Sequence, residues 1–149
     1  FGNEKHIVAL PVKIGFENLA EYDLPFYTGG VTYRLTPDML PAVDKGAGER
    51  LFIIVDDFAG ALVKVSCGGK EQILAWEPYE AEITDCIDRG VSVTLVCTRK
   101  NTFGPLHLVP AITGAVGPEH FTTGGDSFSD DYVLIDSGIF GGIKYEIRR

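Results

Sequence analysis

The stretch ALVKVSCGGKEQILAW, residues 61–76, determines the fold class that the sequence predicts. Apolar and polar side chains alternate in its first half, where the apolar positions are Ala61, Val63, Val65 and Cys67. A period of two residues indicates a β-strand with one buried face. Gly68 and Gly69 follow, and two glycines accept the positive φ angles of a two-residue hairpin turn. The stretch therefore predicts a β-hairpin of Ala61–Cys67 and Lys70–Trp76.

The same alternation predicts further strands at residues 31–36, 91–98 and 143–148. Leu51–Val55 is apolar throughout, which is typical of a strand in the middle of a sheet, covered on both faces. Less regular apolar runs predict strands near His6–Ile14 and Tyr132–Ile135. Prolines restrict the one helical candidate, Asp38–Val43. Pro110–Asp131 lacks a pattern, so we expect a long surface loop there.

Turn-forming residues separate these runs, and 18 glycines and 8 prolines leave little room for long helices. We therefore predict an all-β fold, a two-sheet antiparallel β-sandwich or jelly roll of about eight or nine short strands. Residues 1–149 contain no internal repeat and no break in composition, so we expect one domain. The chain starts at Phe1, and Met39 is its one methionine. We therefore expect the domain to belong to a larger multidomain protein.

The charge of the chain restricts its partners. Its net charge is −8, whereas nucleic acids and anionic membrane surfaces attract positive patches. No apolar run approaches the roughly 20 residues that span a bilayer. A neutral ligand such as a sugar, or a protein surface, fits this charge. The sequence has no Asn-x-Ser/Thr glycosylation site, which leaves the cellular compartment open.

The three cysteines are an odd number, so at least one is unpaired unless it bonds outside the chain. Cys67 and Cys97 both lie in apolar alternating runs. Free cysteine behaves as a small hydrophobic residue in such positions. We therefore expect Cys67 and Cys97 to be buried free thiols.

The sequence gives no sign of a catalytic site. A glycosidase needs two carboxylates facing each other across a sugar, about 5–9 Å apart, and no spacing here places such a pair. Glu80 and Glu82 share one face of an alternating strand, which is typical of a solvated face. Metal-binding histidine spacing and a Gly-x-Ser-x-Gly nucleophile motif are both absent. We expect no cofactor; the alternative is calcium, for which the candidate ligands are Asp56, Asp57, Asp126, Asp130 and Asp131.

Three stretches carry a family resemblance. They are FYTGGVTY at 26–33, the segment 61–87 with its CGGK, WEPY and ITD elements, and RKNTFGPLH at 99–107. In order and spacing they resemble the galactose-binding-like jelly-roll domains of large bacterial glycoside hydrolases, of the β-galactosidase and β-glucuronidase type. The family usually has asparagine where this chain has Cys67, and often glycine where it has Gln72. The resemblance implies a non-catalytic accessory domain that binds carbohydrate or braces the catalytic domain of its parent protein.

Aromatic residues supply the candidate carbohydrate site. A pyranose ring stacks its C–H face on tryptophan or tyrosine while polar side chains bind its hydroxyls. The candidates are Trp76, Tyr79, Arg99, Asn101 and His107. A sugar site requires the Trp76–Tyr79 loop to lie close to the Arg99–His107 loop at one end of the sandwich. The alternatives are that Trp76 packs in the core, that Arg99 and Asn101 bond loop carbonyls, that the domain is purely structural, or that it is a small standalone enzyme.

Overall fold

The computed structural model describes residues 6–9, 18–21 and 24–149, and this part of the chain forms strands with short helical turns. The strands are β1 (His6–Ala9), β2 (Gly30–Leu35), β3 (Arg50–Ile54), β4 (Phe58–Ala59), β5 (Leu62–Cys67), β6 (Lys70–Leu74), β7 (Glu80–Glu82), β8 (Val91–Val96), β9 (Gly138–Ile139) and β10 (Lys144–Arg148). One short α-helix, α1, spans Lys100–Phe103. The 3₁₀ turns are η1 (Leu19–Glu21), η2 (Pro37–Met39), η3 (Lys45–Ala47), η4 (Thr84–Arg89) and η5 (Pro118–His120). No described helix is long and apolar enough to cross a membrane.

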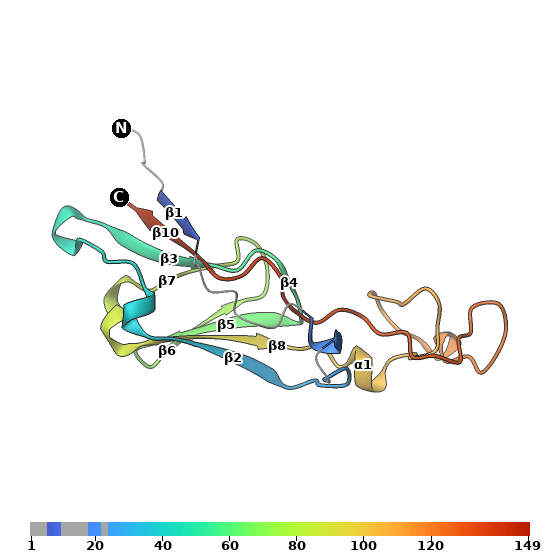
Figure 1. Cartoon of the computed structure of the whole chain (residues 1–149). Coiled ribbons are helices and arrows are strands. Elements are labelled where there is room, and N and C mark those ends of the chain that lie inside the picture. The colour runs from blue at the N-terminus through green and yellow to red at the C-terminus, as the bar shows by residue number, and fades with distance from the viewer. Residues whose placement is uncertain (1–5, 10–17, 22–23) are drawn as a thin grey trace.

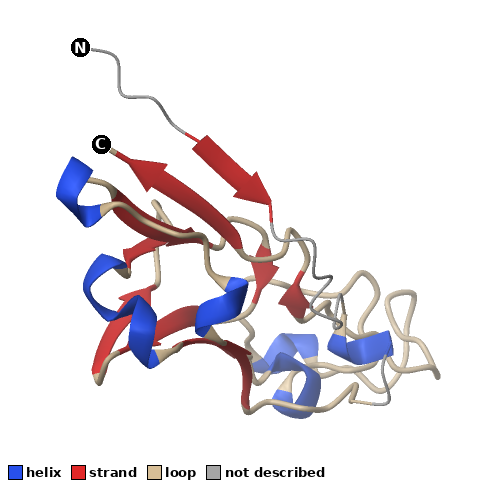
Figure 2. Cartoon of the chain, turned by 60° about the vertical axis from the view of Figure 1, so that its left-hand side comes forward, coloured by secondary structure: helices blue, strands red, loops and turns tan. Residues whose placement is uncertain are grey.

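The strands form two four-stranded sheets, with the orders β1-β10-β3-β7 and β2-β8-β5-β6. A third, two-stranded sheet joins β4 to β9, and all paired strands are antiparallel. Figures 1 and 2 show the two larger sheets as two layers that face each other. The all-β, two-sheet antiparallel sandwich expected from the alternating pattern is therefore confirmed.

The core lies between the two layers and follows from the period of two residues. On β5 and β8 every second side chain is buried, and the residues between them are half-buried. Leu51 and Ile53 of β3 face the same core from the other sheet. Phe52 between them is also buried, on the outer face, where the guanidinium of Arg148 lies 4.1 Å from its ring centroid. The prediction of a central strand at Leu51–Val55 is confirmed by β3, which lies between β10 and β7. Burial of Leu51, Phe52 and Ile53 shows that both faces of this strand are covered.

The β5–β6 hairpin is also confirmed. Cys67 pairs with Lys70 across a two-residue turn. Gly68 and Gly69 in this turn have φ angles of 57° and 83°, which glycine adopts without the steric cost that other residues meet.

One expectation for the cysteines was wrong. Cys67 is not a free thiol, because it forms a disulfide with Cys86, with the two Cα atoms 5.6 Å apart. Turn η4 carries Cys86 back to the end of the hairpin, and no pattern in the sequence indicated that return. Cys97 is a buried free thiol, as expected.

Two predicted elements differ from the structure. Tyr132–Ile135 is not a strand, because its backbone bonds Asn101 and Leu106 instead of a sheet. The helical candidate Asp38–Val43 reduces to η2, which ends at Met39. Of the predicted strand near His6–Ile14, β1 is present and residues 10–14 lie outside the described part of the chain.

Residues 104–137 form a lobe that extends from the α1 end of the sandwich, drawn in orange and red in Figure 1. Turn η5 and one isolated bridge, between Leu108 and Phe128, are its regular features. The lobe contains the expected Pro110–Asp131 loop. Nζ of Lys100, on α1, donates to three consecutive carbonyls of the lobe, those of Ile112, Thr113 and Gly114.

Candidate functional site

Trp76 lies on the surface, in the loop that follows β6. Its side chain is 78% exposed, so Trp76 is not part of the core. The loop is anchored on its other side by Tyr79, whose ring packs edge-on against Phe58 with centroids 5.0 Å apart. The carbonyl of Tyr79 also accepts a hydrogen bond from the amide of Val55, at 3.0 Å. Tyr79 therefore fixes the loop on the sandwich and leaves the tryptophan ring facing solvent.

A shallow depression of about 400 Å³ adjoins this loop and is lined by Ile54, Asp56, Glu77, Pro78, Tyr79 and Glu80. Asp56 bonds Nζ of Lys144 at 2.8 Å, and Glu80 bonds the guanidinium of Arg148 at 2.6 Å. Glu77 is exposed. Carboxylate oxygens accept hydrogen bonds, so these side chains are suited to binding the hydroxyls of a neutral ligand.

The second predicted loop begins at Arg99, which is exposed, and continues through α1. Asn101 is buried, and its amide donates to the carbonyl of Ile135 at 2.8 Å and accepts from the Ile135 amide at 2.9 Å. Nδ1 of His107 lies 2.8 Å from the carbonyl of Ser129. Asn101 and His107 therefore bond loop backbone and hold the lobe in place.

His107 also belongs to a series of aromatic contacts that we call the aromatic row: Phe26, Tyr132, His107 and Phe128. Successive ring centroids lie 5.1, 5.2 and 5.6 Å apart. Phe26 and Tyr132 are 42% and 61% exposed, so one end of the row faces solvent. No spacing pattern in the sequence indicates the row, because its members come from distant loops. Its sequence signals are Phe26, which begins the FYTGGVTY stretch, and His107, which ends the RKNTFGPLH stretch.

The two predicted loops leave the same end of the sandwich. β6 and β8 are both antiparallel to β5, so both end on that side. Phe58 of β4 lies between them. Its ring contacts Tyr79, and it lines a second depression together with Thr98 and Lys100. The tryptophan loop (Trp76–Tyr79) and the Arg99–His107 loop therefore both lie at one end of the sandwich, with Phe58 between them.

The five candidate calcium ligands do not form one site. Asp56 is paired with Lys144, while the carbonyl of Asp57 accepts from the amide of Phe140 at 2.9 Å. Three further aspartates are exposed on the lobe, namely Asp126, Asp130 and Asp131. Within residues 6–9, 18–21 and 24–149, no group of three or more His, Cys, Asp or Glu side chains is arranged to hold a metal ion.

Glu80 and Glu82 share the outer face of β7, as the alternation predicts, and both are paired with arginines. Arg50 donates two hydrogen bonds to Glu82, which lower the pKa of that carboxyl. A general acid in glycoside hydrolysis needs a raised pKa. Glu82 therefore remains ionised near neutral pH and is unsuited to that role.

No family model, curated protein or solved structure matches the chain.

Proposed function

We propose that this chain is a non-catalytic accessory domain of a glycoside-hydrolase-type protein, and that it contacts carbohydrate through Trp76. The observation that carries the proposal is the exposure of this one tryptophan, at 78%. A large ring left in water costs free energy that a folded domain normally avoids by burial. An exposed tryptophan on an anchored loop is therefore suited to a ligand with an apolar face.

We also propose that the sandwich is a jelly roll of the galactose-binding-like kind, and the strand order supports this. If β4 and β9 are left out, eight strands remain, divided equally between two sheets. The first and last strands, β1 and β10, pair with each other within one sheet. A jelly roll likewise has eight antiparallel strands divided between two sheets.

The chemistry of the tryptophan loop fits weak sugar binding. The indole face stacks on the C–H face of a pyranose, and the carboxylates of Asp56 and Glu77 accept hydrogen bonds from its hydroxyls. Pro78 fixes its own φ angle and restricts Glu77, so little ordering entropy is lost on binding. We expect dissociation constants near the millimolar range, about 4 kcal/mol.

Affinity electrophoresis in gels that contain neutral polysaccharides, followed by calorimetry with the best ligand, tests the proposal. We expect the unchanged domain to be retarded and the W76A variant to migrate freely with its thermal midpoint unchanged. I73A is the matched control, because Ile73 is 58% exposed on the adjoining strand β6. Equal retardation of W76A and the unchanged domain, or an equal loss in I73A, contradicts the role of Trp76.

The proposal also implies that the domain alone hydrolyses no common aryl glycoside. Purified domain is incubated with a panel of nitrophenyl sugars, and we expect no release of nitrophenol above the rate without protein. Turnover that disappears on replacement of one Asp or Glu shows instead that the domain is an enzyme.

A second candidate function, structural docking on the catalytic domain of the parent protein, is favoured by a different observation. Eight of the eleven exposed large hydrophobic side chains in the described part of the chain lie on the lobe or beside it: Leu24, Phe26, Tyr27, Phe103, Val109, Val116, Phe121 and Tyr132. Two of them, Phe26 and Tyr132, are in direct ring contact, and exposed apolar patches mark contact sites between proteins. Binding to the separately produced catalytic domain distinguishes the two functions. Docking requires that F26A and Y132A weaken this binding and that W76A does not.

A further inference from the structure

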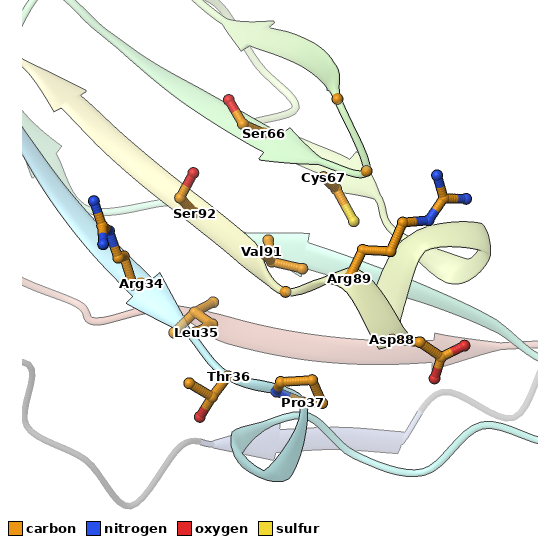
Figure 3. A pocket seen from close by; sticks show the side chains of 13 residues that line it. Arg34, Leu35, Thr36, Pro37, Ser66, Cys67, Asp88, Arg89, Val91 and Ser92 are labelled. Atoms are coloured by element: carbon orange, nitrogen blue, oxygen red, sulfur yellow. The ribbon is translucent and has the colours of Figure 1, made fainter.

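A further depression lies at the opposite end of β6 from Trp76. It has a volume of about 720 Å³ and lies between the end of β2, the start of β8 and the β5–β6 hairpin. Figure 3 shows its lining side chains. Leu35, Val91 and Cys67 belong to the core. The polar side chains form the surface that a ligand meets.

Three of these polar side chains form one straight line across the sheet, which we call the serine row: Arg34, Ser92 and Ser66. Arg34 of β2 is directly opposite Ser92 of β8, and Ser92 is directly opposite Ser66 of β5. Residues opposite each other in a ladder point to the same face of the sheet. Figure 3 shows all three side chains directed to the same side.

The serine row has free hydrogen-bonding capacity. Within the described part of the chain, the hydroxyls of Ser66 and Ser92 bond no other group, and the guanidinium of Arg34 has no carboxylate partner. The next row of the sheet differs, because the hydroxyls of Thr32 and Thr94 bond each other at 2.9 Å. The serine row therefore presents unpaired donors and acceptors to solvent, whereas the two threonine hydroxyls of the next row bond each other.

A second arginine lies at the hairpin end of the depression. Arg89 precedes β8, and a Cβ added at Gly68 would lie 3.3 Å from its guanidinium carbon, so the side chain lies against the turn. Like Arg34, Arg89 has no ion pair within the described residues. Asp88 also lines the depression, but Figure 3 shows its carboxylate directed away from the serine row and from the guanidinium of Arg89. Two unpaired guanidiniums in one depression are notable in a chain of net charge −8.

We propose that this depression binds an acidic saccharide, such as a chain of uronic acids, with Arg34 and Arg89 contacting carboxylates and with Ser66 and Ser92 contacting hydroxyls. Guanidinium binds carboxylate through paired N–H donors. The row from Arg34 to Ser66 crosses two strand spacings, roughly 10 Å. That length accommodates a sugar with several hydroxyls, whereas a single small anion contacts only one end. The inference rests on the proposed function for the kind of ligand, a saccharide, but uses a different site.

Titration of the ¹⁵N-labelled domain with an oligogalacturonate tests the proposal. We expect amide shifts at Arg34, Ser66, Ser92 and Arg89, and an affinity that falls as NaCl is raised. R34Q and R89Q should each weaken binding at least tenfold. K45Q is the control, because Lys45 is exposed, does not line the depression and also lacks an ion pair in the described residues. It should leave affinity within twofold.

Two further ligands identify the source of any binding. The neutral oligogalactose of the same length should bind at least tenfold more weakly at this depression, because it lacks carboxylates. Sodium sulfate should shift only the two arginines, and the S66A/S92A double variant should weaken oligogalacturonate without changing the effect of sulfate. No oligogalacturonate binding, an equal loss in K45Q, or identical responses to sulfate and sugar overturns the proposal.

Failure here is distinguishable from failure of the proposed function. That function is tested at Trp76 with neutral polysaccharides, and W76A should leave oligogalacturonate binding at the serine row intact. R34Q should likewise leave retardation in neutral polysaccharide gels unchanged. Loss of one activity with retention of the other therefore shows which site is wrong.

Discussion

Asn101 and Ile135 are joined by two hydrogen bonds, one in each direction. The side-chain amide of Asn101 donates to the carbonyl of Ile135 at 2.8 Å, and the backbone amide of Ile135 donates to Oδ1 at 2.9 Å. Asn18 holds the next residues in the same way, because its Oδ1 accepts from the amide of Ser137 at 3.3 Å. The segment that brings the lobe back to the sandwich therefore has its backbone bonded by the side chains of two asparagines and not by a neighbouring strand.

Replacement of Asn101 by alanine should loosen this return segment. The substitution leaves the N–H and C=O of Ile135 without partners, and an unsatisfied buried polar group costs about 1–3 kcal/mol. We expect urea unfolding to show a loss of that size and amide exchange at Ile135 to become much faster. T102A is the control, because the Thr102 hydroxyl makes one exposed bond, to the carbonyl of Phe26. Unchanged protection of the Ile135 amide in N101A shows that the pair does not hold the lobe.

A second prediction concerns Arg148, on the outer face of the β1-β10-β3-β7 sheet. Its guanidinium lies over Phe52 and bonds both Glu80 and the buried Glu146. These hydrogen bonds raise the pKa of Arg148. R148M keeps much of the contact with Phe52 but removes the charge from two carboxylates, and we expect it to lower the free energy of unfolding by about 1–2 kcal/mol.

The control for Arg148 is R50Q, on the neighbouring strand. Among the described residues, Arg50 forms an ion pair with Glu82 alone, is exposed and lies farther from the Phe52 ring centroid than Arg148 does, at 5.2 Å. Exposed ion pairs contribute little to stability. Its urea midpoint should therefore stay near that of the unchanged protein. Equal midpoints for R148M and R50Q contradict a stabilising role of the half-buried pair.

Burial of Tyr145 predicts that the free energy of unfolding falls at alkaline pH. Burial raises the pKa of this tyrosine from 10.0 to about 12, so the folded protein retains a proton that the unfolded chain releases above pH 10. Its contribution to stability is complete below pH 10 and is lost as the pH rises to 12. A difference of two pH units corresponds to about 2–3 kcal/mol. Urea unfolding at pH 8, 10 and 11.5 measures this loss.

Y145F should remove that part of the alkaline loss. The Tyr145 hydroxyl has no hydrogen-bond partner in the described residues, so phenylalanine should keep or slightly raise stability at pH 8. Y132F is the control, because Tyr132 is exposed and should leave the alkaline profile unchanged. The interpretation is wrong if Y145F and the unchanged protein lose stability in parallel above pH 10.

The sequence predicted those parts of the fold that depend on local signals. The β5–β6 hairpin has both its strand alternation and its turn residues within residues 61–76, so its register followed directly. The central position of β3 followed from the apolar run Leu51–Val55. A strand with one buried face would have polar residues at every second position, and this run has none. The lobe has no such signal, because Asn101 and Ile135 are bonded by a side chain and not by a strand ladder.

The candidate sites were harder to predict because they depend on register and on distant loops. The exposure of Trp76 depends on how Tyr79 and Phe58 anchor the loop, and the sequence left core packing open. The serine row requires both the pairing of β2 with β8 and that of β8 with β5. Alternation shows which residues of a strand share a face, but not which residues of other strands lie beside them.

The disulfide between Cys67 and Cys86 makes the last prediction. It closes a segment with a sequence separation of 19 residues, and constraint of the unfolded chain over such a loop contributes roughly 3 kcal/mol. The C67A/C86A double variant should therefore lose about 2–4 kcal/mol in urea unfolding. Dithiothreitol should destabilise the unchanged protein by a similar amount and leave the double variant unaffected.

Counting reactive thiols tests whether the stability difference between the unchanged protein and the C67A/C86A variant comes from the disulfide. Unfolded without reductant, the unchanged protein should show one reactive thiol, which belongs to Cys97, and after reduction it should show three. C97A is the control. It should show no thiol before reduction and two after it, and it should keep its sensitivity to dithiothreitol, because Cys97 contributes packing and no cross-link. Three reactive thiols in the unreduced, unfolded protein mean that Cys67 and Cys86 are not bonded. The stability of the hairpin end then depends on the β5–β6 turn and the core alone.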